Sequence, residues 1–163
     1  MNATDHAALL DRFYAAFAVL DGDTMQACYL EDAQFEDPVF ELRGRSQVGG
    51  MWRMLCGVTR EKARDAWKLQ VSGISADASS GRAHWEAYYR FSATGRQVHN
   101  VIEAQFTFKD GLIATHRDSF DFWLWSRQAL GVTGTLLGWT PMLHKKVRAQ
   151  AASGLAAFMR KNA

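Results

Sequence analysis

The 163-residue chain lacks most of the features that assign a protein quickly. Its only cysteines, Cys28 and Cys56, fall in predicted helices and form no CxxC pair, so we expect two buried thiols in a reducing compartment. The sequence has no apolar run of about 18 residues and no hydrophobic N-terminal signal. Secretion and membrane spanning are therefore not expected, and the predicted location is the cytoplasm.

The sequence is equally poor in cofactor motifs and in charge of one sign. The GxSxG, HExxH, Walker and GxGxxG patterns are absent, and the five histidines show no recurring ligand spacing. We therefore expect no metal ion, no nucleotide and no other cofactor. The formal net charge of only +2 gives no argument for a nucleic-acid partner, because such partners select a clustered basic face.

What the chain does contain is large apolar side chains. Hydrophobic residues make up 48% of the sequence, and six Trp and ten Phe contribute to an aromatic share of 12%. A chain of this length buries about two-thirds of its unfolded surface as one domain, here residues 1–163. Aromatic side chains in this number line either one tight core or a cavity for a hydrophobic ligand.

The spacing of apolar residues divides the chain into helical and extended parts. Segments with helical spacing run over about 9–20, 23–30, 46–56, 122–130 and 140–160. Segments with a period of two predict strands at 64–76, 82–92, 97–109 and 112–122, and a short strand is expected around Phe35. This order predicts an α+β domain with an antiparallel sheet, one face of which is covered by helices.

Alternation along the strands predicts which side chains point inward. In strand 97–109 the inward set is Val98, Asn100, Ile102, Ala104, Phe106 and Phe108. In strand 82–92 the more apolar set is Trp85, Ala87, Tyr89 and Phe91, which places His84, Glu86, Tyr88 and Arg90 outward, where a subunit interface is possible. In the last strand neither parity is clearly apolar, so the direction of His116, Asp118 and Phe120 stays open.

The last predicted helix has a basic face, which consists of His144, Lys145, Lys146 and Arg148, opposite Met142, Leu143 and Val147. A basic amphipathic helix can lie on a membrane or bind a partner. We interpret this face as the solvated side of a packing helix, and a membrane partner is not expected.

Two carboxylates, Asp37 and Asp118, lie in segments that are otherwise rich in apolar and aromatic residues. An ionised carboxylate buried without a partner costs several kcal/mol, or its pKa rises by roughly 3–5 units instead. A raised carboxylate pKa serves general acid–base chemistry near neutral pH. His116 is two residues from Asp118 on the same strand and therefore shares its face.

Several short motifs, in this order, resemble one known superfamily. They are Gly22-Asp23, Phe35-Glu36-Asp37-Pro38, Thr94-Gly95-Arg96 and Phe108-Lys109-Asp110-Gly111-Leu112-Ile113. Their spacing resembles the NTF2-like superfamily over residues 5–122, and most closely its branch of SnoaL-like, ketosteroid-isomerase-like and limonene-epoxide-hydrolase-like proteins. The resemblance implies a cone-shaped, curved antiparallel sheet wrapped around the N-terminal helices. Two extra helices over 122–161 would lie outside this core, and members usually form homodimers through the outer sheet face.

The resemblance also implies roles for the two acids. Asp37 matches the proton-shuttling base of ketosteroid isomerases. However, Ala15 and Ala104 stand where that family has its oxyanion donors, with Tyr14 and Glu103 one residue away, so steroid isomerisation is not expected. Asp118 matches the carboxylate with which epoxide hydrolases activate water. The partner motif of that family aligns with His84-Trp85-Glu86 only through a gap that conflicts with the alternation above.

These observations define one candidate site. Its predicted catalytic residues are Asp37, Asp118 and His116, and we expect both acids to face one internal cavity. Its predicted substrate-binding residues are Asn100, Trp52, Phe35, Phe106, Phe120, Tyr14, Trp85 and Tyr89. The site predicts a cofactor-independent isomerase, cyclase or hydrolase that acts on a hydrophobic small molecule.

The alternative function is a non-catalytic ligand-binding protein or dimeric scaffold. Under that alternative, Asp37 is a turn carboxylate, Asp118 forms a structural salt bridge with an arginine, His116 is a satisfied core histidine and Asn100 is a structural amide. Fold analogy does not choose between the two functions.

Overall fold

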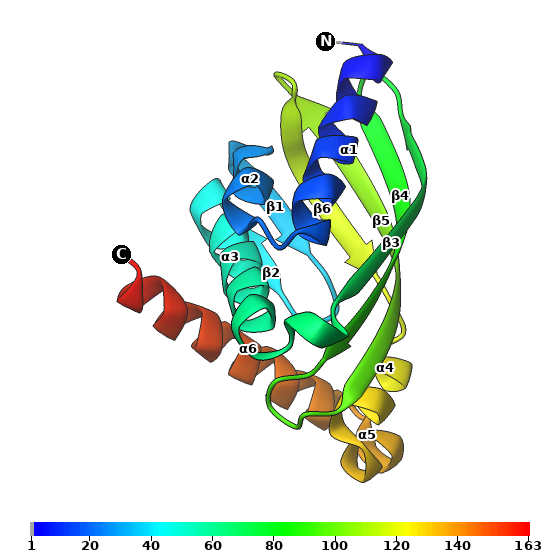
Figure 1. Cartoon of the computed structure of the whole chain (residues 1–163), viewed down its shortest axis with the longest axis vertical. Coiled ribbons are helices and arrows are strands. Elements are labelled where there is room, and N and C mark those ends of the chain that lie inside the picture. Colours follow the sequence, from blue (N-terminus) through cyan, green and yellow to red (C-terminus); the bar gives the residue numbers. More distant parts are fainter. Residues whose placement is uncertain (1) are drawn as a thin grey trace.

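The computed structural model describes residues 2–163 and shows a six-stranded sheet curved around two long helices (Figure 1). The N-terminal helices are α1 (Ala3–Ala18), α2 (Gly22–Ala27) and α3 (Arg45–Lys62), and a 3-10 turn follows at Arg64–Ala66. The strands are β1 (Tyr29–Glu36), β2 (Glu41–Arg43), β3 (Lys68–Ala76), β4 (Ser80–Arg90), β5 (Gln97–Lys109) and β6 (Leu112–Ser119). The C-terminal helices are α4 (Phe122–Leu130), α5 (Val132–Leu137) and α6 (Pro141–Lys161). The α+β class and the curved sheet are thus confirmed.

The sheet is mixed and not wholly antiparallel as expected. Its strand order is β2-β1-β6-β5-β4-β3, and β1 runs parallel to β6, with Phe35 beside His116. A parallel pair needs a long crossover connection, and here that connection includes α3 and the four strands β2, β3, β4 and β5. No turn signal in the sequence marks such a pairing, because the two strands are far apart along the chain.

Several predicted boundaries were wrong. The second helix ends at Ala27 instead of Leu30, and Cys28 is its C-cap residue instead of a helical one. The Cys28 carbonyl accepts a hydrogen bond of 2.9 Å from the Ile113 amide, so the chain is drawn into the sheet at this point. Tertiary pairing therefore overrides the local helical pattern, and Tyr29 begins β1.

Other elements differ mainly in length. The third helix extends to Lys62, strand β3 begins only at Lys68, and β6 ends at Ser119. The strand over 97–109 and the helix over 122–130 are confirmed as β5 and α4. The short elements β2 and α5 were not predicted, because three and six residues carry too little periodicity.

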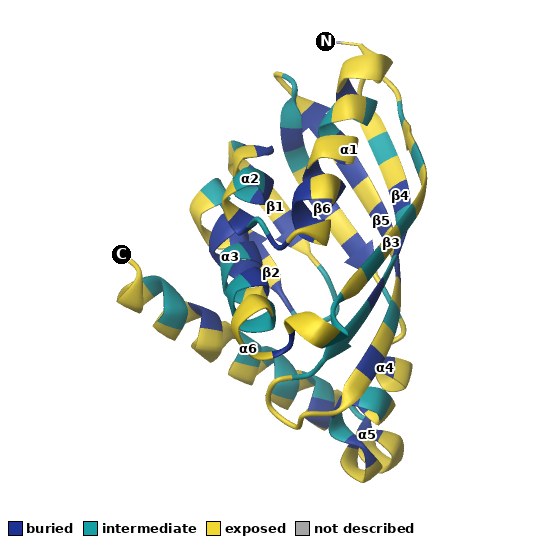
Figure 2. Ribbon diagram, in the orientation of Figure 1, coloured by how far each residue is buried: buried dark blue, intermediate teal, exposed yellow. Residues whose placement is uncertain are grey.

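The core lies between the concave inner face of the sheet and the helices α1 and α3 (Figure 2). Alternation is confirmed on β4 and β5, where Trp85, Ala87, Ile102, Ala104 and Phe106 are buried and their neighbours face outward. Phe13 and Phe17 of α1 pack edge-on against Trp52 of α3. The sheet and these two helices thus enclose an aromatic interior.

The C-terminal helices contact both the sheet and α3. Trp125 of α4 donates a hydrogen bond of 2.8 Å to the Tyr89 hydroxyl on β4, and α6 packs along α3, where Leu155 is buried. The two helices expected after the core are present, with the short α5 between them. Among the described residues, no helix is both long and apolar enough to cross a membrane.

Candidate active site

A chain of buried polar side chains crosses the interior from β1 to β6. The Tyr29 hydroxyl lies 2.7 Å from His116 Nδ1, and His116 Nε2 lies 2.8 Å from Asp118 Oδ1. All three side chains are buried. The parallel pairing of β1 with β6 and the alternation of β6 bring them together, since His116 and Asp118 are two residues apart and share the inner face.

One arrangement of protons satisfies every hydrogen bond among these polar side chains. The Trp52 indole N–H donates to the Tyr29 oxygen over 2.9 Å, and in this arrangement Tyr29 donates its own proton to His116 Nδ1. His116 Nδ1 then accepts, and its Nε2–H donates to Asp118. This arrangement gives each group a partner, and we call the set Tyr29, His116 and Asp118 the relay.

The relay ends at a carboxylate with one constrained oxygen. Asp118 Oδ1 also receives the Trp85 indole N–H, at 3.4 Å. No described residue donates a hydrogen bond to the other oxygen, Oδ2. Among residues 2–163, the one ionic partner of Asp118 is His116. No arginine there forms the salt bridge that would make Asp118 purely structural.

Tyr14 contributes a second unpaired polar atom to this interior. Its hydroxyl is buried, and it has no hydrogen-bond partner among the described residues. Burial, and then the negative charge of Asp118, raise the pKa of Tyr14 well above its ordinary value. Tyr14 also lies near Trp85 and Phe106, with ring centroids 6.4 Å away in each case. Its hydroxyl therefore stays protonated and can donate a hydrogen bond within the electrostatic reach of Asp118.

Aromatic side chains surround the relay. Phe106 lies 4.3 Å from the His116 ring, and Phe35 meets that ring edge-on at 5.0 Å. Trp52 stacks nearly parallel to it at 6.1 Å. These rings exclude water, which strengthens the hydrogen bonds of the relay.

Asp37 lies outside the relay, in the turn between β1 and β2. Its Oδ1 accepts hydrogen bonds from the amides of Val39 at 2.7 Å and Phe40 at 2.6 Å. Asp37 is therefore a turn carboxylate, which was one alternative from the sequence. Burial nevertheless raises its pKa to about 7, because the loss of water outweighs the two amide donors, and the charge of Asp118 acts in the same direction. Arg148 of α6 opposes the rise.

The remaining predicted residues lie around the relay at different depths. Asn100 is half-buried on the inward parity of β5, opposite Ala87 of β4. Phe120 is half-buried just after β6 and packs against both the main core and the smaller cluster beneath α4. Tyr89 is half-buried on β4, where burial raises its pKa to about 12 and the charge of Asp37 adds to the rise. Tyr89 thus lies within the electrostatic reach of Asp37.

Side chains on the outer face of the sheet exclude one pairing that the resemblance suggested, which is that of Glu86 with Asp118. His84 Nδ1 lies 2.5 Å from Glu103 Oε1, and His99 Nε2 lies 3.4 Å from Glu86 Oε2, all on the side away from the core. Glu86 therefore cannot reach Asp118 through the sheet, and the gapped alignment of His84-Trp85-Glu86 was wrong. Trp85 occupies the inward position, and its indole N–H donates to Asp118.

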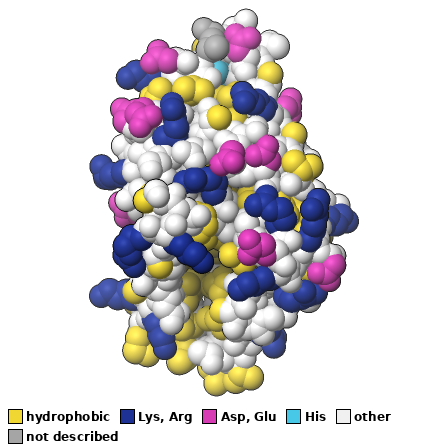
Figure 3. All heavy atoms as spheres, turned by 60° about the vertical axis from the view of Figure 1, so that its left-hand side comes forward, with side chains coloured by type: hydrophobic (Ala, Val, Ile, Leu, Met, Phe, Trp, Pro, Cys, Tyr) yellow, Lys and Arg dark blue, Asp and Glu magenta, His cyan; other side chains and the backbone are white. Residues whose placement is uncertain are grey.

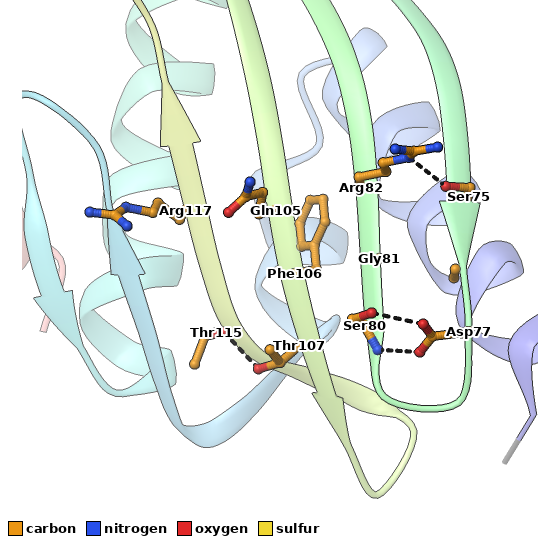
Figure 4. Close-up of a pocket in the computed structure, with 11 residues that line it drawn as sticks. Ser75, Asp77, Ser80, Gly81, Arg82, Gln105, Phe106, Thr107, Thr115 and Arg117 are labelled. Carbon is orange, nitrogen blue, oxygen red and sulfur yellow. Dashed lines mark hydrogen bonds between the residues drawn. The ribbon is translucent and has the colours of Figure 1, made fainter.

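A hollow of about 700 Å³ lies on this outer face, away from both acids (Figure 4). It is open, and polar side chains such as Arg82, Gln105 and Arg117 surround it. It contains neither Asp37 nor Asp118 and is not the cavity that we expected. Figure 3 shows a different hollow, lined by hydrophobic side chains, in the lower half of the face that carries α2 and α3.

Sequence reasoning missed Tyr29, the first member of the relay. The local pattern extended the second helix over it, and only its pairing beside Ile113 of β6 places it in the sheet. The aromatic residue directly after Cys28 is the one available signal, because a strand that enters a core favours such residues. Among residues 2–163, no three His, Cys, Asp or Glu side chains are grouped closely enough to hold a metal ion.

Comparison with known proteins agrees with this architecture. The family model of the SnoaL-like domain matches residues 10–116. The chain therefore belongs to the SnoaL-like family, within the NTF2-like superfamily. A search of the curated proteins finds no match.

Solved structures with the same fold include proteins of three reaction classes. An epoxide hydrolase of the limonene-epoxide-hydrolase-like type from M. tuberculosis is 20% identical, with a TM-score of 0.63 over 83% of this chain and 97% of its own. A candidate polyketide cyclase from Xanthomonas campestris is 19% identical, with a TM-score of 0.62 over 77% and 97%. A candidate ketosteroid isomerase from Kribbella flavida is 17% identical, with a TM-score of 0.54 over 73% and 79%. At these identities the likeness shows the fold alone.

Proposed function

We propose that this chain is a cofactor-independent enzyme that transfers protons on a hydrophobic small molecule, as an isomerase, cyclase or hydrolase. The observation that carries the proposal is the arrangement at Asp118. Its Oδ1 is held by the His116 and Trp85 N–H groups, and its Oδ2 has no partner among the described residues. A carboxylate fixed through one oxygen and open at the other is oriented to accept a proton from a carbon acid or from water.

Tyr14 supplies the second element that such chemistry needs. Removing a proton beside a carbonyl places negative charge on the substrate oxygen, and a preorganised donor stabilises that charge in a dry site. The Tyr14 hydroxyl is buried, protonated and unpaired among residues 2–163. An unsatisfied buried hydroxyl costs about 1–3 kcal/mol, and a ligand oxygen bound there would remove that cost.

Asp37 would act as the acid that donates its own proton to the substrate, while Asp118 keeps the proton it accepted, and exchange with water would restore both groups. With a pKa of about 7, it holds a proton in much of the population at neutral pH, unlike an ordinary carboxylate. We propose that the apolar hollow of Figure 3 admits the substrate. That hollow lies in the half of the molecule where α6 contacts the Asp37 turn through the Pro38 carbonyl.

One observation favours the alternative, a non-catalytic ligand-binding or dimeric scaffold protein. The backbone N–H groups of Val39 and Phe40 both donate to Asp37 Oδ1, and under this alternative they would be the whole role of Asp37. A homodimer through the outer sheet face also stays a proposal, supported by the half-buried His84 and Glu86 and by Tyr88 stacked on His99 at 4.1 Å. Sedimentation equilibrium measures whether the protein is a homodimer.

A cytoplasmic location likewise stays a prediction.

The test separates catalysis from binding with a panel of apolar ketones and epoxides. Deuterium uptake from D₂O into each ketone, and hydration of each epoxide, report proton transfer. Thermal shift on the same panel reports binding, where a ligand at a hundred times its Kd stabilises by about 2.7 kcal/mol.

We expect Asp118→Asn to lower the rate by about 10²–10⁴-fold and Tyr14→Phe to lower it by about 10²-fold. Arg117→Gln, on the same strand but exposed, is the matched control and should keep the rate. Binding without turnover would favour the scaffold alternative. An Asp118→Asn variant with full activity would contradict the proposal.

A further inference from the structure

The C-terminal helices differ in charge from the rest of the chain. Residues 1–121 carry 13 basic and 17 acidic side chains, a formal charge of −4. Residues 122–163 carry six basic side chains and no acidic one, a formal charge of +6. A charge asymmetry of this size within one small protein is typical of a chain with an anionic partner.

The same segment exposes large hydrophobic side chains at one end of the molecule. They are Val132 at 76% exposure, Leu136 at 64%, Trp139 at 73% and Met142 at 69%. We call these four residues the apolar tip. They lie on α5, on the turn after it and on the first turn of α6, which together form the lower end of the molecule in Figure 1. Met142 was expected on the packing face of α6, and this was wrong.

Tight packing on the opposite side of α5 fixes the outward direction of the tip. A Cβ atom at Gly134 would lie 1.8 Å from the Ser126 carbonyl oxygen, so α5 can approach α4 only through this glycine. Val132 and Leu136 are each two residues from Gly134, about half a helical turn away. They therefore point away from α4, and the core cannot bury them without breaking that contact.

Basic side chains surround the apolar tip. Lys145 and Lys146 are exposed and lie three and four residues after Met142, on the same face of α6. Arg127 is exposed on α4 and lies over the Trp123 ring at 4.9 Å. Asp121, the nearest acid in the sequence, accepts the Leu124 amide as the N-cap of α4.

We propose that the apolar tip and the lysines beside it dock this protein on an anionic lipid membrane. Protruding Trp and Leu side chains enter the headgroup region, where Trp is favoured, while Lys and Arg contact the anionic headgroups. A second copy of the chain is a poor occupant, because a symmetric interface through the tip would bring together two segments that each carry a formal charge of +6. Peptides that bind protein surfaces commonly occupy grooves, whereas this tip protrudes.

The docked orientation would also bring the proposed active site toward the lipid. Helix α6 begins at the tip, and its His144 and Arg148 both donate to the Pro38 carbonyl in the Asp37 turn. A hydrophobic substrate dissolved in the membrane would then meet the apolar hollow of the same half of the molecule. This last step rests on the proposed function, whereas membrane docking does not.

The test is co-sedimentation with vesicles of phosphatidylcholine containing 30% phosphatidylserine, compared with pure phosphatidylcholine, without any substrate. We expect binding to the anionic vesicles alone at about 0.1 M salt, and weaker binding as screening increases. Lys145→Ala/Lys146→Ala should weaken binding by roughly 25-fold, about fivefold per lysine. Leu136→Ser/Trp139→Ser should abolish it, and a blue shift of tryptophan fluorescence should be lost with it.

Matched controls distinguish docking from general effects of substitution. Val19→Ser removes an equally exposed hydrophobic side chain at 67% exposure, outside the tip, and should leave binding unchanged. Asp118→Asn should also bind the anionic vesicles like wild type. Membrane docking would therefore stand even if the proposed enzymatic function failed.

Two outcomes would overturn the proposal. The first is wild-type protein that does not sediment with the anionic vesicles. The second is a dimer in solution that Leu136→Ser/Trp139→Ser dissociates, which would make the tip a self-association surface.

Discussion

Asp118 is buried in the core and Asp37 is half-buried in the turn between β1 and β2, and different groups hold the two acids. Asp118 is on a strand and accepts two side-chain donors, the His116 imidazole and the Trp85 indole. Asp37 is in a turn and accepts two backbone donors from its own segment. Removing Asp118 therefore leaves other groups unpaired, whereas neutralising Asp37 removes only a desolvated charge. The two acids should differ in the sign of their effect on stability.

The largest expected effect is the loss of stability in Asp118→Ala. This variant leaves the Nε2–H of His116 and the indole N–H of Trp85 without acceptors in the core. Because each buried unsatisfied donor costs about 1–3 kcal/mol, we expect the free energy of unfolding to fall by about 2–5 kcal/mol. Urea denaturation at pH 7 measures it.

The control for Asp118→Ala is Arg117→Ala. Arg117 is the adjacent residue of β6, but its side chain is 62% exposed and its pair with Glu36 is 3.4 Å long. Its removal should cost no more than about 1 kcal/mol. The relay would be contradicted as a structural unit if Asp118→Ala lowered the free energy of unfolding by less than about 1 kcal/mol, or raised it.

The second-largest expected effect is a pH dependence of the free energy of unfolding, which Asp37 causes. Its pKa is about 7 in the folded chain, above the ordinary 3.8 that it has when unfolded. Below about pH 4 the carboxyl is protonated in both states. From about pH 4 to 7 the unfolded chain releases the proton and the folded chain keeps it, so the free energy of unfolding falls as pH rises, by a few kcal/mol in all.

Asp37→Asn tests this dependence because the amide oxygen can still accept the Val39 and Phe40 amides. The variant should be more stable than wild type at pH 8 and equal to it near pH 4. Thermal denaturation across this pH range gives the comparison, and Asp32→Asn, at an exposed position on β1, controls for the loss of one carboxylate. Parallel profiles for wild type and Asp37→Asn would show that Asp37 is not protonated at neutral pH.

The smallest effect is expected from Arg148→Gln. The Arg148 guanidinium lowers the pKa of Asp37, although burial has the larger, opposite effect. Its loss should move the midpoint of the Asp37-dependent pH profile upward, by less than about one pH unit, and should leave Asp118 unaffected. Arg160→Gln, an exposed position near the end of the same helix, is the matched control. A downward shift of this midpoint would show that a group other than Arg148 determines the pKa of Asp37.

The alternation of β5 shows how far local pattern predicts this fold. Val98, Ile102, Ala104, Phe106 and Phe108 are all buried, as a period of two requires for a strand with one face against a core. The same rule identified the inward direction of Trp85 on β4. It gave no direction for β6, because His116 and Asp118 are polar residues at buried positions and so remove the contrast on which the pattern depends.

The sequence by itself determined the class of fold, the helical extension after β6 and the two acids that merit attention, because each of these depends on nearby residues. Only the tertiary structure decided what the acids do. The parallel pairing of β1 with β6 brings Tyr29 to His116, and curvature of the sheet buries the relay against Trp52 and Phe106. Such contacts join residues far apart in the chain, and their hydrogen bonds and desolvation exist only after folding.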